Sequence, residues 1–249
     1  MSVELTRSGT TAIVTINRPE RRNALDGATI AGIGAAFLAA EADDEVRAVI
    51  ITGAGDQAFC AGADLKAPRG EAPTGPGLEV FTNRCYPKPV IAAVNGAAVG
   101  GGFELVLASD LVVVADHVSF SVPEVFRGLV GAGCTTRLAS RLPPAVVAEL
   151  TFLGERLSVE RALALGLVNA VVPGPELLDR ALAMGARLAE AAPIALRITK
   201  ELLFREQGMH DDDEWKAIRA EAAPAFASED AKEGAAAFAA KRTPVWTGR

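Results

Sequence analysis

The sequence contains few cysteines and few aromatic side chains. Its three cysteines, Cys60, Cys85 and Cys134, are an odd number and show no C-x-x-C spacing, which argues against a disulfide framework and against a zinc knuckle. Phe, Trp and Tyr make up 5% of the 249 residues, whereas apolar residues make up 50%. Alanine, valine, leucine and isoleucine must therefore fill the core, and a chain of this length can bury a large one.

The sequence also lacks an excess of positive charge and a long hydrophobic run. Lysine and arginine number 25 against 31 acidic residues, a net charge of -6. This balance argues against general nucleic-acid binding but is compatible with a local basic patch for a phosphorylated ligand. The longest uncharged run, Pro89 to Phe103, is rich in glycine and shorter than the roughly 20 residues of a membrane span. The N-terminus has no basic segment followed by an apolar one, so we predict a reduced, soluble, cytoplasmic protein without a membrane partner.

Strands that alternate with helices predict an α/β fold. Asp26 is placed to cap a helix over residues 27 to 41, because aspartate is favoured at that position. Strands are predicted at 11–16, 46–51, 90–94 and 111–115, and a short helix is predicted to begin at the glycine triplet 100–102. Residues 67 to 79 are rich in proline and glycine, which predicts a loop.

The character of the sequence changes near Ala192. Pro193 suits the first position of a helix, and that helix is predicted to end before Gly208. Its apolar stripe consists of Ile194, Ile198, Leu202 and Leu203. Residues 211 to 213 are acidic and suit the beginning of a second helix, and Ser228 can cap a third. We therefore divide the chain into a core, residues 1–191, and a helical region, residues 192–249, that is expected to dock on a neighbouring subunit.

Two glycine-containing turns are candidates for binding negative charge. The triplet Gly100 to Gly102 follows a strand and opens a helix, so its amide N–H groups are free to meet an anion or a developing oxyanion. The turn around Gly62, in residues 59–65, is a candidate for the other half of such a pair. A tight junction that needs a positive φ, or an ordinary turn, explains each feature equally well.

Two acidic residues stand beside these segments. Glu104 follows the triplet directly, and Glu124 lies in an apolar stretch after Pro123. Each residue alone is explained as a capped or solvated carboxylate. The alternative is that the two together form a general acid and base pair. Residues 53–58 match G-x-G-x-x-A, but Gly62 and Pro68 interrupt the helix that a dinucleotide site requires. His117 and His210 show no metal-ligand spacing, so no metal site is predicted.

Taken together, these segments resemble the enoyl-CoA hydratase (crotonase) family over essentially the whole chain. No single motif is decisive, but their order and spacing match. The segments that carry the resemblance are residues 17–25, 58–66, 88–96, 100–105, 120–124, 164–169 and 237–242.

The resemblance implies a ββα spiral core with a C-terminal helical region that builds trimers or dimers of trimers. It also implies an acyl-CoA thioester substrate and no metal or redox cofactor, since coenzyme A is part of the substrate. Carried onto this sequence, the oxyanion amides belong to Ala63 and Gly101, and the two catalytic glutamates of the hydratases are Glu104 and Glu124. We expect both carboxylates in one cleft, with both amides pointing into it.

The residues that the resemblance places at the coenzyme A and substrate site form a larger set. They are Arg21, Arg22, Ala24, Ala61, Asp64, Leu65, Lys66, Gly100, Phe238 and Lys241. Phe238 and Lys241 match positions that reach a neighbouring subunit's site in this family, although a lone Phe and Lys on a helix also simply pack and solvate.

Departures from the hydratase pattern leave the acyl group open. Residues 128–133 lack the proline that is common there, and Cys134 stands where glycine is common. The ending, residues 241–249, resembles carnitinyl-CoA dehydratases. We expect walls from segment 67–79 and from residues 126–134, with apolar surface from Leu65, Leu78, Val80, Phe81 and Leu129. No acid there has an obvious reason to face a quaternary ammonium group, so an uncharged short or medium enoyl chain is preferred to a carnitinyl group. The alternatives are a carnitinyl-CoA dehydratase, an isomerase or a non-catalytic binding protein.

Overall fold

The computed structural model describes residues 1–67, 74–207 and 212–249, and it contains a six-stranded sheet with the order β1-β2-β3-β5-β7-β10. β1 pairs with β2 in the antiparallel sense, and the remaining neighbours pair in parallel. The strands are β1 (Val3–Ser8), β2 (Thr11–Ile16), β3 (Ala48–Gly53), β5 (Val90–Val94), β7 (Leu111–Ala115) and β10 (Ala170–Val172). The strands predicted from the sequence are confirmed, but β1 and β10 were not predicted.

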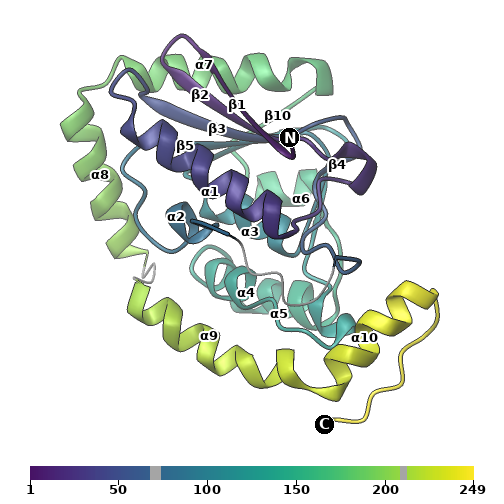
Figure 1. Ribbon diagram of the computed structural model, residues 1–249. Helices are drawn as coiled ribbons and strands as arrows, with labels where there is room; N and C mark the ends of the chain where they lie inside the picture. The colour runs from purple at the N-terminus through teal and green to yellow at the C-terminus, as the bar shows by residue number, and fades with distance from the viewer. Residues whose placement is uncertain (68–73, 208–211) are drawn as a thin grey trace.

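Helices cover both faces of this sheet, which a parallel sheet of apolar strands requires. α7 (Leu177–Ala189) contacts β3, β5 and β7, while α1 (Gly27–Ala42) contacts β1 and β2. Figure 1 shows the two helices on opposite sides of the sheet. α1 begins where the sequence predicts, because the Asp26 carboxylate accepts a hydrogen bond from the Thr29 amide at 2.8 Å.

A second, smaller sheet was not predicted, and it positions the candidate site. Its order is β4-β6-β8-β9, with β4 (Ala58–Cys60), β6 (Ala97–Val99), β8 (Ser119–Ser121) and β9 (Leu157–Ser158). β4, β6 and β8 run parallel, so their carboxyl ends meet at one edge. Ala63, Gly101 and Glu124 each follow one of these ends by two or three residues. The sheet therefore brings three distant segments of the chain together.

Short helices connect these strands and complete the core. α3 rests on the second sheet, where the rings of Phe103 and Phe120 lie 4.9 Å apart between centroids. The helical segments before the C-terminal region are η1 (Pro19–Arg21), α2 (Glu79–Thr82), α3 (Gly101–Ala108), η2 (Glu124–Arg127), α4 (Ala132–Ala139), α5 (Pro144–Phe152), α6 (Val159–Ala164) and η3 (Gly174–Glu176). The described residues contain no helix that is long and apolar enough to cross a membrane.

Three helices follow α7 and run in an arc around the core (Figure 1). They are α8 (Pro193–Glu206), α9 (Asp212–Ala227) and α10 (Glu229–Ala240), the last capped by Ser228 as predicted. α9 contacts α4, and α10 contacts η2, so these two helices have partners in their own chain. α8 buries none of its residues fully, and its predicted stripe, Ile194, Ile198, Leu202 and Leu203, is exposed. The division at residue 192 and the trimer stay predictions.

Candidate active site

The turn after β4 leaves one amide without a partner. Leu25 donates its N–H to the Gly62 carbonyl at 2.8 Å and accepts from the Asp64 amide at 2.9 Å. These bonds fix the backbone on both sides of Ala63, whose own N–H donates no hydrogen bond within the described ranges. Gly62 has φ +81°, and a Cβ there would lie 2.7 Å from the Val99 carbonyl oxygen. Glycine is therefore required for the turn to approach β6 this closely.

The beginning of α3 supplies a second free amide beside the first. A Cβ on Gly62 would lie 3.3 Å from the Gly101 nitrogen, so the two turns are in contact. Gly100 has φ +54° and donates to the Ser121 carbonyl at 3.0 Å, whereas no acceptor in the described chain receives the Gly101 N–H. At the first turn of a helix this amide has no intrahelical partner. The amides of Ala63 and Gly101 are thus available to a ligand oxygen.

Glu104 lies one turn further along α3, with its carboxylate against α4. A Cβ on Gly133 would lie between 2.0 and 2.5 Å from the Glu104 carboxylate atoms, so only glycine leaves the carboxylate this space. Burial raises the pKa of Glu104, and the positive charge of Arg137 opposes this shift.

Glu124 opens η2 and directs its carboxylate toward the glycine triplet. A Cβ on Gly100 would lie 2.2 Å from Glu124 Oε1, and one on Gly131 would lie 3.4 Å from Oε2. Oε2 is buried and has no hydrogen-bond partner among the described residues. Burial raises the pKa of Glu124 to about 7; the charge of Glu104 adds to the rise, whereas its own backbone amide and Arg127 oppose it. A buried carboxylate oxygen without a partner marks the place for a water or substrate atom.

One cavity of about 980 Å³ is lined by Glu104, Glu124, Ala63 and Gly101. Of the predicted walls, Leu78 and residues 129–134 line the cavity, whereas residues 68–73 of segment 67–79 lie outside the described part of the chain. Val80 and Phe81 were wrongly predicted to line it: both are buried in the core, where Phe81 stacks on Phe37 at 4.1 Å between centroids. Glu79, within the predicted wall segment 67–79, also lines the cavity, so an acid faces it where none was expected to face a quaternary ammonium group.

The walls predicted from the sequence did not include α9, which forms a further wall of this cavity. The residues of this helix that line the cavity are Trp215, Ile218, Arg219, Ala222, Ala223, Phe226 and Ala227. Trp215, Ile218, Ala222 and Phe226 recur at helical spacing, so the sequence indicates an apolar face. It does not indicate which surface that face meets.

A second cavity, of about 530 Å³, adjoins the first through Ala63, Glu124 and Leu129, which line both. Arg22, Lys66 and Lys241 supply positive charge to it. It contains every residue that the resemblance places at the coenzyme A site: Arg21, Arg22, Ala24, Ala61, Asp64, Leu65, Lys66, Gly100, Phe238 and Lys241.

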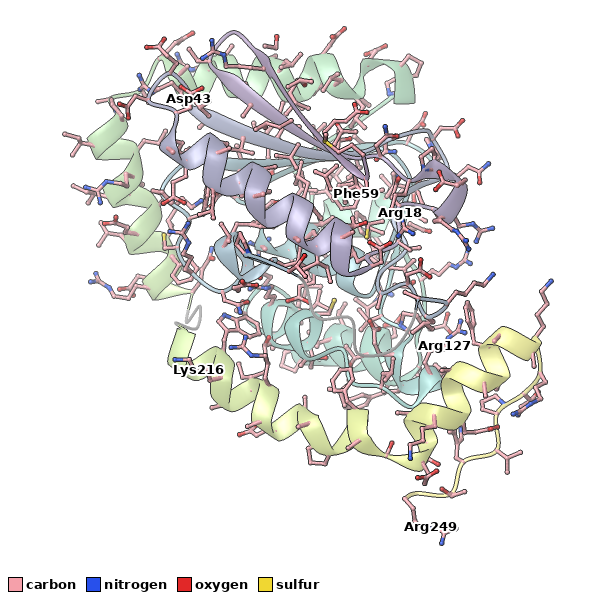
Figure 2. All side chains as sticks on the ribbon, in the orientation of Figure 1. Arg18, Asp43, Phe59, Arg127, Lys216 and Arg249 are labelled. Atoms are coloured by element: carbon pink, nitrogen blue, oxygen red, sulfur yellow. The ribbon has the colours of Figure 1, made fainter. Side chains whose placement is uncertain are left out.

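Three of these residues have contacts that the resemblance did not specify. Phe238 and Lys241 line the cavity of their own chain, and their reach to a neighbouring subunit's site stays a prediction. The guanidinium carbon of Arg127 lies 4.0 Å from the centroid of the Phe238 ring, and Figure 2 shows Arg127 beside α10. The Asp64 carboxylate pairs with Arg18 at 3.2 Å, so it fixes the turn, and Arg18 lies near the beginning of α1 (Figure 2).

The competing motif and His117 take no part in this site. Residues 53–58 lead from β3 through a turn into β4 and open no helix, which confirms that no dinucleotide fingerprint is formed. His117 contacts the Asp56 carbonyl at 3.0 Å, and His210 lies outside the described residues. Within the described ranges, no group of three His, Cys, Asp or Glu side chains could hold a metal ion.

The fold and the site define a protein in which two carboxylates and two free amides face one cavity. A family model described as enoyl-CoA hydratase/isomerase matches residues 6–249. A carnitinyl-CoA dehydratase from Salmonella paratyphi A is 44% identical over 262 residues, which covers 100% of this chain and 99% of the relative. The chain therefore belongs to the enoyl-CoA hydratase/isomerase, or crotonase, family.

Solved structures agree with this assignment. The chain is similar to a carnitinyl-CoA hydratase from Mycobacterium avium, at 42% identity and a TM-score of 0.92. It is also similar to an enoyl-CoA hydratase from Mycobacterium tuberculosis, at 40% identity and a TM-score of 0.77. Each comparison covers 100% of this chain and 99% of the other.

Proposed function

We propose that this protein catalyses the reversible addition of water to the double bond of a 2-enoyl-CoA thioester. The observation that carries the proposal is the convergence of Glu104 and Glu124 on one cavity, beside the amides of Ala63 and Gly101. A binding protein has no need for two buried carboxylates at that place. The adjoining cavity, with Arg22, Lys66 and Lys241, suits the phosphates of coenzyme A.

The two amides act on the thioester oxygen. Attack at the β-carbon moves an electron pair through the double bond onto the thioester oxygen, which becomes an enolate. The N–H groups of Ala63 and Gly101 meet that charge without reorganising, and the loss of one such donor typically costs about 2.7–4 kcal/mol in kcat. The enolate then collapses as the α-carbon takes a proton.

The two glutamates move the protons of this reaction. One carboxylate removes a proton from the water whose oxygen bonds to the β-carbon, and the other delivers a proton to the α-carbon, so that one H₂O is added in total. Such acid and base assistance typically contributes about 10²–10⁴-fold. A pKa of about 7 for Glu124 matches a group that gives and takes a proton near neutral pH.

The test uses crotonyl-CoA and the loss of absorbance of its conjugated thioester. We expect activity in the wild type and a loss of about 10²–10⁴-fold in Glu104→Gln and Glu124→Gln, because a glutamine side chain in place of either carboxylate does not transfer a proton. Glu176→Gln is the matched control, since Glu176 is an exposed carboxylate outside both cavities. Wild-type activity that survives both substitutions contradicts the mechanism.

A second candidate is the same reaction on carnitinyl-CoA, in the dehydration direction. The relative from Salmonella paratyphi A carries that name, and Glu79 supplies an acid on the wall of the larger cavity. Its Oε1 accepts the Gly77 amide at 2.7 Å, which fixes the carboxylate. A fixed negative charge suits a trimethylammonium group better than an uncharged alkyl chain does.

Kinetics separate the two substrates. The measurement compares kcat/KM for crotonyl-CoA, octenoyl-CoA and crotonobetainyl-CoA on one preparation. A preference for the betaine thioester that disappears in Glu79→Gln supports the carnitinyl reaction. A preference for either uncharged thioester that Glu79→Gln leaves unchanged supports the general hydratase.

A further inference from the structure

A buried arginine of α4 interacts with Glu104 but is not among the residues that line the cavity. Arg137 is 2% exposed and belongs to α4. It follows Gly133 by four residues, so the two share one face of that helix. Gly133 is the residue against which the Glu104 carboxylate rests. Helix geometry therefore places Arg137 one turn beyond the residue that the carboxylate contacts, and the two charges interact.

The neighbours of Arg137 hold its guanidinium without neutralising it. One nitrogen, Nη2, donates to the Thr82 carbonyl oxygen, and the guanidinium carbon lies 4.6 Å from the centroid of the Trp215 ring. Nε is buried and has no hydrogen-bond partner among the described residues. No salt bridge within 4.0 Å joins Arg137 to an acid of the described chain. An isolated buried charge is unfavourable, so a nearby opposite charge is needed.

We propose, on the basis of the hydration reaction proposed above, that Arg137 is a positioning residue that favours the ionised form of the Glu104 carboxylate and orients it. Glu104 is then the group that removes the proton of water, and Glu124 is the group that delivers one to the α-carbon. Among the described residues, the cation that acts on Glu124 is Arg127, which is partly exposed and lies over the Phe238 ring. The difference in charged surroundings between the two acids thus comes from Arg137 of α4 and from the Trp215 ring of α9, which lies over the guanidinium.

Other charged and titratable groups act on Glu104 from the surrounding elements. Glu124 of η2 is a like charge, and the Cys134 thiol of α4 interacts with both glutamates. Arg219 of α9 lines the same cavity. Burial raises the pKa of Glu104, and Arg137 is the charge that opposes the rise. Burial in turn lowers the pKa of Arg137 to about 10, against the charge of Glu104.

The experiment measures the pH dependence of kcat/KM, whose acidic limb reports the ionisation of the base in the free enzyme. Arg137→Gln removes the charge and retains a donor for the Thr82 carbonyl. We expect the limb to move up by about 1–3 pH units, the range for loss of a close opposite charge. Arg137→Lys keeps the charge and is expected to keep the limb near its wild-type position.

Arg141→Gln is the matched control. Arg141 is also largely buried, but it donates to the Ser109 carbonyl at 3.2 Å and its opposite charge is Asp110. We expect it to change stability and leave the limb in place. If Arg137→Gln does not fold, Trp215→Leu replaces it, because it admits water to the guanidinium and is expected to shift the limb upward by less.

A limb that stays in place in the folded variants, or that Arg141→Gln moves equally, overturns the proposal. An infrared titration of the Glu104 carboxyl band, assigned by its loss in Glu104→Gln, gives a readout that needs no activity. An upward shift of that band's pKa in Arg137→Gln, in a protein that hydrates no thioester, keeps the role of Arg137 and contradicts the proposed function alone. If the pKa of that band does not shift in Arg137→Gln while the wild type hydrates the thioester, the role of Arg137 is contradicted and the proposed function is kept.

Discussion

Gly133 offers the sharpest single substitution for testing the geometry of the site. A Cβ added there would lie 2.0 Å from Glu104 Oε1 and 2.5 Å from Oε2, so Gly133→Ala cannot coexist with the present carboxylate position. The clashing atoms are the end of a flexible side chain, so rotation of Glu104 relieves the overlap and the backbone can stay in place. The variant therefore displaces the catalytic group without removing it.

The magnitudes predict a large effect of this substitution on activity and a small one on stability. Loss of one acid or base lowers kcat by about 10²–10⁴-fold. In contrast, alanine in place of glycine in a helix favours folding by up to about 1 kcal/mol, which offsets part of the repacking around Glu104. We expect Gly133→Ala to lose nearly all hydration of crotonyl-CoA while its free energy of unfolding changes by less than about 2 kcal/mol.

The assay pairs steady-state kinetics with urea unfolding on the same preparations. Gly174→Ala is the control, because a Cβ there would meet only the His117 ring, at 3.7 Å, and it should leave kcat unchanged. Retention of kcat in Gly133→Ala would refute the placement of Glu104. Unfolding of the variant would refute the view that only a side chain must move.

Three further predictions concern the oxyanion amide, the titration of Glu124 and assembly. Gly101→Pro removes an N–H at the first helical position, where proline is tolerated, and should lower kcat by about 10²–10³-fold. Gly101→Ala keeps the N–H, and its Cβ would lie 3.4 Å from Leu25 Cδ1, so it should retain most activity. Equal losses in the two variants contradict the role of the amide. Because the folded-state pKa of Glu124 is raised from 4.5 to about 7, the folded protein binds the extra proton between these values, so stability falls as pH rises through that range, by about 3 kcal/mol. Glu124→Gln should therefore be more stable than wild type at pH 8 but not at pH 4, and parallel unfolding curves at both pH values contradict the shift. The wild type should form a trimer-based oligomer by light scattering, and Ile198→Glu with Leu202→Glu should reduce its mass; a wild-type monomer at micromolar concentration contradicts the assembly.

The sequence was sufficient for β2, β3, β5 and β7 of the larger sheet and for α1. The strands at 11–16, 90–94 and 111–115 and the helix after Asp26 are long enough to show a clear apolar pattern or cap. The second sheet was not predictable in the same way, because β4, β6, β8 and β9 have only two or three residues each. Their pairing depends on contacts between distant segments, and no local pattern encodes it.

The site was foreseen through the resemblance, while its surroundings required the structure. Glu104 and Glu124 were identified by motif position, and the structure places both on one cavity. Glu79 falls within the predicted wall segment 67–79, but its orientation toward the cavity was not predicted, since a surface acid at the beginning of a short helix has no distinctive signal. Trp215 was missed because its partner, Arg137, lies on α4, and the sequence does not reveal which helices meet.

Mass spectrometry of the reaction in H₂¹⁸O tests the central claim most directly. Wild-type protein incubated with crotonyl-CoA or crotonobetainyl-CoA should form the 3-hydroxyacyl thioester with one ¹⁸O at the β-carbon, and Glu104→Gln and Glu124→Gln should form almost none. A product in which the double bond has moved, without incorporation of ¹⁸O, or the absence of product from either thioester despite binding of coenzyme A, would contradict hydration by the two glutamates.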